Sequence, residues 1–287
     1  QPANTAAPDA SLPRGVPRKS PGLMLICDGS DSLADTCHRA CSRLLTRLRE
    51  IFPPRDRDHT TSLRILVFET RDRYRQWADV HAPENADVTG YFAPATGDVV
   101  ATHTGTDAAL IATLAHELTH AVVRDHLGTR FLPPWLDEGL ASVYETAQIA
   151  DDGTVTFGAL HEPYARMVGA RLRSGESLDL RRLATMGYGL FANRDRQKML
   201  DNYAVAWSLL WYILNGERGL YHGTLRLYLT EIAAVPDRST QYVAAYDTVV
   251  SPRADSLVAG WRVWASRADE GLPPANENEN DHGHDDD

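Results

Sequence analysis

The stretch Leu114-Ala-His-Glu-Leu-Thr-His-Ala-Val122 decides how the whole chain is interpreted. Within it, His116, Glu117 and His120 form the pattern His-Glu-x-x-His in a run whose apolar residues recur at helical spacing. Residues four apart lie on one face of a helix, so both imidazoles can reach a single metal ion. Zinc suits nitrogen ligands in a site with one open position. Glu117 points to the edge of that face, where a zinc-held water would lie.

The alternative interpretation is an ordinary half-buried helix that carries two neutral histidines. The chain has eleven histidines, and a chance match to the pattern has a probability of roughly a few per cent. The neighbours Leu110, Leu114 and Leu118 give this helix a strong apolar stripe. Because a buried helix does not tolerate two histidines and a carboxylate without partners, metal binding is the favoured interpretation.

A catalytic zinc site needs a third protein ligand, and two residues compete for that role. His126 lies six residues after His120, where metzincins carry their third histidine. That geometry needs a glycine at position 123, but the chain has Val123, which is poor at the required turn. We therefore expect the helix to continue and to turn His126 away. The other candidate is Glu138, in the first turns of the following helix. Its ordinary alternative role is to stabilise the N-terminus of that helix by its negative charge.

The context of Glu138 is Pro134-Trp-Leu-Asp-Glu-Gly-Leu-Ala141. Together with His-Glu-Leu-Thr-His, this context resembles gluzincins, the thermolysin and membrane alanyl aminopeptidase type of metallopeptidase. Over residues 21–268 the chain is similar to the peptidase-MA-like domain proteins, a gluzincin group. The Gly-x-Met-Glu-Asn segment with which aminopeptidases bind a free amino terminus does not precede His116. Aminopeptidase activity is therefore not expected.

The resemblance implies a set of roles at the site. His116, His120 and Glu138 would hold one zinc ion per chain. Glu117 would take a proton from a zinc-activated water and deliver it to the leaving amine. Tyr203, on a later helix, would help the zinc to stabilise the oxyanion.

Two of the candidate residues have ordinary alternatives. Tyr203 also falls on an apolar stripe with Trp207 and Leu210, so a core position and a catalytic position stay equally open. Glu145 lies seven residues after Glu138 on the same helix face and can accept a hydrogen bond from a zinc histidine. We expect Glu145 instead to be a solvated surface carboxylate.

The predicted fold class is α+β. A small N-terminal sheet with helices and an edge hairpin precedes a mainly helical, zincin-like part, and the active-site helix lies between them. The predicted organisation is a disordered leader (1–20), an α/β subdomain (21–106), a helical catalytic subdomain (107–270) and a disordered acidic tail (271–287).

Within the α/β subdomain, apolar runs predict strands at Leu23–Cys27 and Leu63–Glu69. Helices are expected over Ser32–Phe52 and Arg71–Val80, and this order suggests a small sheet with helices on one face. A β-hairpin follows around Ala95-Thr-Gly-Asp98 and leads into the motif helix. Its edge strand would either bind an extended peptide as a further strand or simply close the sheet.

Later helices are expected over the following stretches: Trp135–Gln148, Glu162–Arg173, Leu178–Met186, Arg196–Leu214, Leu220–Ala234 and Arg253–Arg267. His103, just before the motif helix, is expected to be an edge histidine and no ligand.

Composition limits the partners. The net charge is −10, and six acids without any Lys or Arg lie in the tail, so nothing indicates a nucleic-acid surface. No apolar run approaches the length of a membrane helix. The small-residue opening is typical of a chain after signal cleavage, so we expect an extracytoplasmic location, periplasmic or secreted. Cys27, Cys37 and Cys41 allow at most one disulfide, from Cys27 to one of the others, or are small buried hydrophobes.

The sequence thus predicts a zinc metallopeptidase that acts on peptide or protein substrates, with its oligomeric state left open. The competing hypothesis is a catalytically silent, zinc-stabilised binding module of the same fold. The presence of Glu117 argues against that module, because a structural zinc site is normally closed by four ligands and needs no general base.

Overall fold

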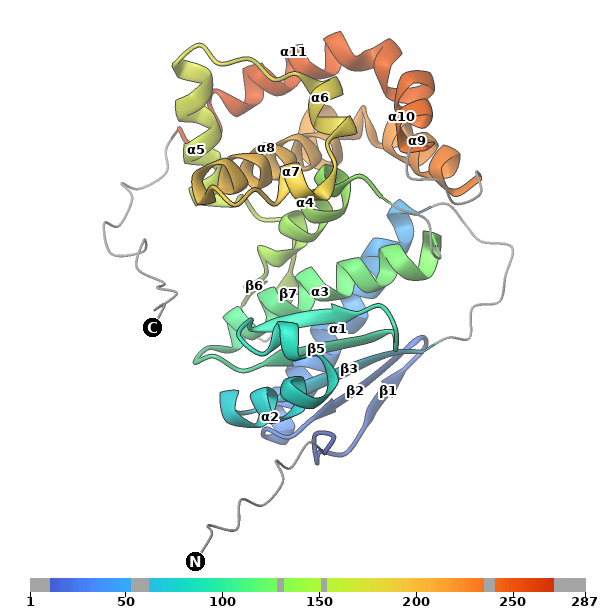
Figure 1. Cartoon of the computed structure of the whole chain (residues 1–287), viewed down its shortest axis with the longest axis vertical. Helices are drawn as coiled ribbons and strands as arrows, with labels where there is room; N and C mark the ends of the chain where they lie inside the picture. The colour runs from blue at the N-terminus through green and yellow to red at the C-terminus, as the bar shows by residue number, and fades with distance from the viewer. Residues whose placement is uncertain (1–10, 53–61, 128–131, 151–153, 235–240, 271–287) are drawn as a thin grey trace, which may run out of the picture.

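The computed structural model describes residues 11–52, 62–127, 132–150, 154–234 and 241–270. A five-stranded sheet at one end of the molecule has the order β1-β2-β3-β5-β4 (Figure 1). Its strands are β1 (Arg18–Ser20), β2 (Leu23–Cys27), β3 (Leu63–Phe68), β4 (Gly90–Ala93) and β5 (Asp98–Thr102). The inner strands β2, β3 and β5 are parallel, whereas β1 and β4 are antiparallel edge strands. The predicted hairpin and its position at the sheet edge are confirmed.

The rest of the described chain is mainly helical, which confirms the α+β class (Figure 1). The α-helices are α1 (Asp31–Ile51), α2 (Arg71–His81), α3 (Asp107–Leu127), α4 (Pro134–Glu145), α5 (Glu162–Arg173), α6 (Leu180–Thr185), α7 (Tyr188–Phe191), α8 (Arg196–Asn215), α9 (His222–Ala234), α10 (Gln241–Ala245) and α11 (Ala254–Ala265). Shorter elements are the 3-10 turns Pro83–Asn85, Gly216–Gly219 and Ser251–Arg253, a π-helical turn Tyr246–Val250, and a two-stranded ribbon of β6 (Gln148–Ile149) and β7 (Val155–Thr156).

Both faces of the sheet are covered by helices. Ile65 and Val67 of β3 belong to the main core with α1 and α3, whereas Leu66 and Phe68 pack with Trp77 of α2 in a second core. Successive strand residues point to opposite faces, so an almost wholly apolar strand must be covered on both. The expectation of helices on one face is therefore wrong.

The motif helix α3 lies between the sheet and the helical part (Figure 1). Its apolar side chains, among them Leu110, Leu114 and Leu118, are fully buried in the main core. The hydroxyl of Thr106 accepts a hydrogen bond from the Ala109 N–H at 3.2 Å, so Thr106 caps the N-terminus of the helix. Because the leucines are buried, the opposite face of α3 is turned toward the cleft, and that face carries the two motif histidines.

Helices α4 and α8 approach each other closely at Gly139. A Cβ atom at this position would lie 2.8 Å from Leu210 Cδ1 and 3.0 Å from the Ala206 carbonyl oxygen. The glycine after Glu138 thus lets α8, which carries Tyr203, pack against the helix that carries the predicted third ligand.

Replacing Gly139 with alanine is expected to lower the free energy of unfolding by about 1–3 kcal/mol, because the new methyl group overpacks this contact. Denaturant unfolding measures the change. Gly223 is the matched control, since it lies in α9 and a Cβ atom there would meet nothing within 4 Å. Gly223→Ala should be neutral or slightly stabilising. Equal effects of the two substitutions would contradict the close approach.

The structure also corrects the N-terminal boundary. Arg18–Ser20 form β1 and pair with Leu23–Leu25 of β2, so the predicted disordered leader does not extend to residue 20. Residues 1–10 and the acidic tail 271–287 lie outside the described residues. The later helices occur close to their predicted positions, whereas α7 and α10 were not expected. None of the described helices is both long and apolar enough to span a membrane.

The three cysteines are free and buried. Cys27 lies at the end of β2, and Cys37 and Cys41 lie on the core face of α1. Burial raises the pKa of the Cys41 thiol to about 12 and raises the pKa values of the other two thiols as well. The interpretation as small buried hydrophobes is confirmed, and the alternative of a disulfide from Cys27 is not realised.

Candidate metal centre

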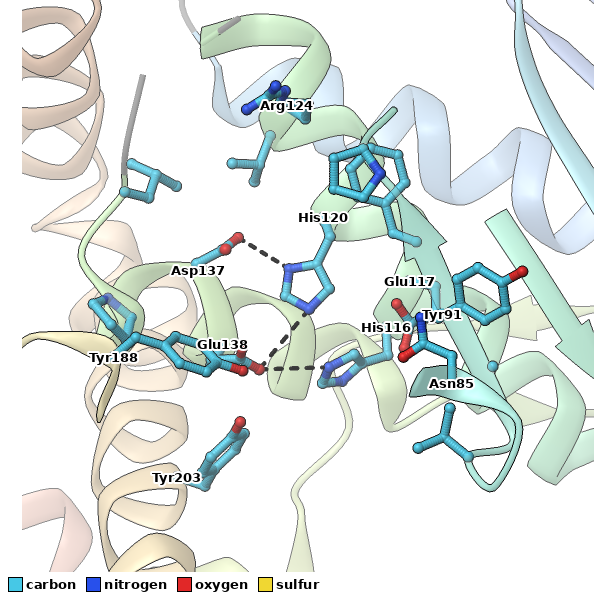
Figure 2. A pocket seen from close by; sticks show the side chains of 17 residues that line it. Asn85, Tyr91, His116, Glu117, His120, Arg124, Asp137, Glu138, Tyr188 and Tyr203 are labelled. Carbon is cyan, nitrogen blue, oxygen red and sulfur yellow. Dashed lines mark hydrogen bonds and ion pairs between the residues drawn. The ribbon is translucent and has the colours of Figure 1, made fainter. Parts of the chain in front are cut away.

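Three side chains from two helices converge at one point. His116 and His120 of α3 direct their Nε2 atoms at the Glu138 carboxylate of α4 (Figure 2). The distances from Glu138 Oε2 are 3.6 Å to His116 Nε2 and 3.8 Å to His120 Nε2. All three ligand atoms lie within 4.8 Å of one another. The predicted third ligand therefore lies beside the predicted pair.

Each histidine is supported from behind by a carboxylate of α4. His116 Nδ1 lies 2.7 Å from Glu145 Oε2, and His120 Nδ1 lies 3.0 Å from Asp137 Oδ1. Because an ionised carboxylate only accepts hydrogen bonds, each imidazole donates its N–H from Nδ1. When Nε2 has lost its proton, as metal binding requires, both Nε2 lone pairs are directed at the common point.

The electrostatics of the site favour a cation. Burial lowers the pKa of His116, but Glu138 and Glu145 outweigh this effect and raise the pKa well above its usual value. Burial also lowers the pKa of His120, but the charge and hydrogen bond of Asp137 outweigh burial and raise this pKa above its usual value. Burial raises the pKa of Glu138, yet the two histidines bring the net pKa below its usual value, so Glu138 is ionised at neutral pH. The same negative field that raises the histidine pKa values attracts a metal cation.

The residues fit a zinc ion. Two imidazole nitrogens and one carboxylate oxygen are a ligand set of catalytic zinc sites, with one position left for water or substrate. Ligand atoms about 2.0–2.2 Å from a tetrahedral zinc stand roughly 3.3–3.6 Å apart, close to the separations of Glu138 from the histidines. Glu138 is only 6% exposed, and a buried carboxylate needs a partner of opposite charge. The site can therefore hold a metal ion.

Two tyrosine hydroxyls lie on the other side of Glu138 (Figure 2). Tyr203 of α8 and Tyr188 of α7 line the cleft, and both hydroxyls interact with the Glu138 carboxylate and with each other. Burial and the charge of Glu138 raise the pKa of both phenols, so both keep their protons and act as donors. Tyr203 is thus both a partly buried packing residue and a residue of the site.

Glu117 completes the set. It lines the cleft that contains the three ligands and a second hollow on the opposite side of His116. In Figure 2 it lies on the β4 side of His116, near Tyr91 and Asn85. Since Glu117 is next to His116 in sequence, α3 rotates it about 100° away from the ligand face, as the sequence predicts. It lines the cleft without being one of the three ligands.

Two other histidines lie elsewhere. Helix α3 continues through Val123 to Leu127, and His126 stacks on Phe52 with ring centroids 4.7 Å apart. The metzincin alternative is therefore wrong, for the reason expected from the β-branched Val123. His103 pairs with Asp107 at 3.2 Å near the start of α3.

Sequence reasoning missed or misjudged several residues of the site. Glu145 is not the expected solvated carboxylate, because its side chain is 24% exposed and binds His116. For Asp137 the sequence suggests only a favourable charge at the helix N-terminus. Two sequence signals identify these carboxylates. Asp137 is adjacent to Glu138, and Glu145 follows Glu138 by seven residues, which is two helical turns. Tyr188 lies on a four-residue helix without any periodic pattern, so no sequence signal pointed to it.

Removing either supporting carboxylate is expected to weaken zinc binding by about 10–100-fold, because the imidazole loses its fixed tautomer and orientation. Glu145→Gln and Asp137→Asn test this for His116 and His120, with affinities measured by competition against a chromophoric chelator. Glu50→Gln is the control, since Glu50 is a surface carboxylate of α1 that pairs only with Arg47 among the described residues. Unchanged affinity in both test variants would rule out the supporting role.

Comparison with known proteins adds no activity. The family described as "Protein of unknown function (DUF1570)" matches residues 110–228. The matched segment contains the His116, His120 and Glu138 cluster as well as Glu117 and Tyr203, and it leaves the N-terminal sheet outside. No curated protein matches the chain. The chemistry that the molecule can perform therefore follows from the site itself.

Proposed function

We propose that this chain is a zinc-dependent peptidase of the gluzincin type. The observation that carries the proposal is the convergence of His116, His120 and Glu138 in an open cleft that Glu117 also lines. A purely structural zinc site would be closed by a fourth protein ligand. The cleft has a volume of about 630 Å³, which is enough for several residues of a peptide.

The residues of the cleft divide the chemistry among them. A zinc ion held by His116, His120 and Glu138 supplies Lewis acidity toward water and toward the substrate carbonyl. The Glu117 carboxylate accepts a proton from the attacking water and passes it to the leaving amine. Tyr203 keeps its proton because burial raises its pKa, so its hydroxyl can donate a hydrogen bond to the developing oxyanion.

The position of β4 supports a peptide as the substrate. Gly90, Tyr91 and Phe92 of this edge strand line the same cleft as the ligands. An edge strand has unpaired backbone groups that can bind an extended chain as a further strand. The metal centre lies beside this edge and would face the backbone of such a peptide.

The test begins with zinc per chain, measured by elemental analysis on the full-length protein with His282→Ala and His284→Ala, so that tail imidazoles do not contribute. About one zinc is expected. A peptide library is then digested with and without a chelator, and cleavage products are identified by mass spectrometry. Chelator-sensitive cleavage supports the proposal. One tightly bound zinc without any cleavage favours the silent binding module, and no zinc after reconstitution excludes both.

A further inference from the structure

The cleft extends along α3 on both sides of the metal centre. The larger hollow, about 630 Å³, reaches past His120 to Val123 and Arg124, and a second hollow of about 440 Å³ reaches back to Ala112. Both share His116 and Glu117. From Ala112 to Arg124 the helix rises about 18 Å, which matches roughly five residues of an extended peptide. A bound chain would therefore have residues on either side of the reacting bond.

Arg124 stands at one end of this path. It follows His120 by four residues, which places it one turn farther along the same face of α3. Figure 2 shows it at the opposite end of the cleft from Tyr203. The described lining of the larger hollow includes no other lysine or arginine. A substrate that passes the metal centre along the helix meets this guanidinium next.

The Arg124 guanidinium has no ion pair or hydrogen bond with any residue that the structure describes. Asp137 lines the same cleft, but it accepts the hydrogen bond from His120. By contrast, Arg64 binds Asp98 and Arg173 binds Asp269, each through two hydrogen bonds. The donors of Arg124 are available to a ligand.

The surroundings of Arg124 make such a ligand selective. Apolar side chains from Val123, Leu132 and Pro134 line the same hollow. A half-buried guanidinium beside apolar walls is less screened than a surface charge, so it gains more from a carboxylate than it would in open water. A planar, five-donor group also matches both oxygens of a carboxylate at once.

We propose that Arg124 is a specificity-determining residue that binds a carboxylate of the peptide substrate. This inference rests on the proposed peptidase function. The carboxylate has two possible sources, which share this chemistry: an Asp or Glu side chain a fixed number of residues from the cleaved bond, or the free carboxyl terminus of a short peptide. The residue selects and positions the substrate and takes no part in bond cleavage.

The experiment compares the cleavage specificity of zinc-loaded wild type, Arg124→Gln and Arg124→Glu on one peptide library, presented with free and with amidated carboxyl termini. Wild type should prefer Asp or Glu at one fixed position, or a free terminus at a fixed distance from the cleaved bond. Amidation abolishes only the second preference. Arg124→Gln should lower kcat/KM for the preferred peptides by about tenfold or more, and Arg124→Glu should reverse the preference toward Lys or Arg.

Two controls keep the result interpretable. Zinc content equal to wild type shows that the Arg124 variants are folded at the metal centre. Arg39→Glu makes the same charge change on the exposed face of α1 and should leave the specificity unaltered. Cleavage by wild type without any preference for a carboxylate, or with a preference that Arg124→Glu does not change, would overturn the inference and leave the peptidase function standing. Absence of cleavage by wild type would overturn both.

Discussion

Glu117→Gln is expected to bind zinc as wild type does and to lose peptide hydrolysis by about 10²–10⁴-fold. The amide keeps the size of the carboxylate but cannot accept the proton of the attacking water, and general base catalysis contributes about 10²–10⁴-fold. Glu117 is none of the three clustered ligands, so the metal content should not change. Elemental analysis measures the zinc content. The turnover of a peptide identified in the library digest, measured on the same preparation, gives the loss of hydrolysis.

Tyr203→Phe is the informative companion variant. It removes one hydroxyl that interacts with Glu138 and preserves the packing of the ring against Phe191. Loss of one oxyanion donor is expected to lower kcat by about 10²–10³-fold, with KM little changed. Undiminished kcat would reduce Tyr203 to a packing residue. Retained activity in Glu117→Gln would be more serious, because it would refute the assignment of the general base and with it the proposed mechanism.

Glu138→Gln is expected to reduce bound zinc from about one per chain to near zero under conditions where wild type stays loaded. The substitution removes the charge of a ligand that is 6% exposed and lies between two imidazoles. Its effect on affinity should exceed the 10–100-fold expected for an outer carboxylate. Competition with a chelator measures the affinity, and thermal unfolding with added zinc measures the lost stabilisation.

His126→Ala is the matched comparison for Glu138. It removes a histidine that also follows the motif, but one that stacks on Phe52 away from the cluster. Zinc affinity should stay at the wild-type level, although some stability is lost with the ring contact. If His126→Ala released the metal and Glu138→Gln did not, the ligand set proposed from the geometry would be wrong.

The sequence predicted those parts of the site that depend on a single helix. His116 and His120 share a face because they are four residues apart. Val123 disfavours the bend that His126 would need to reach the metal, and the helix continues through it. Placing Glu138 required a resemblance, since spacing alone does not bring α4 against α3. What could not be predicted depends on how separate elements meet: Tyr188 comes from a short helix, and Glu145 binds His116 only because α4 runs beside the histidines.

The fold shows the same division. Strands and long helices followed from apolar periodicity, because each signal lies within one segment. The position of α2 on the second face of the sheet did not follow from its own sequence. It is decided by Leu66 and Phe68 of β3, which need a cover on that side. The small strand Arg18–Ser20 has no apolar signal and exists because β2 offers it an edge.

The buried thiols can report how often the hydrophobic core of this protein opens transiently. Cys37 and Cys41 are at most 2% exposed on α1, and their raised pKa values keep them protonated. A thiol reagent can therefore modify them only in molecules whose core has transiently separated. Where reclosing is fast, the labelling rate follows the population of the open form. The ratio of labelling rates with and without added zinc would then report, in native buffer, how strongly an ion bound by α3 and α4 stabilises the packing of α1 against α3.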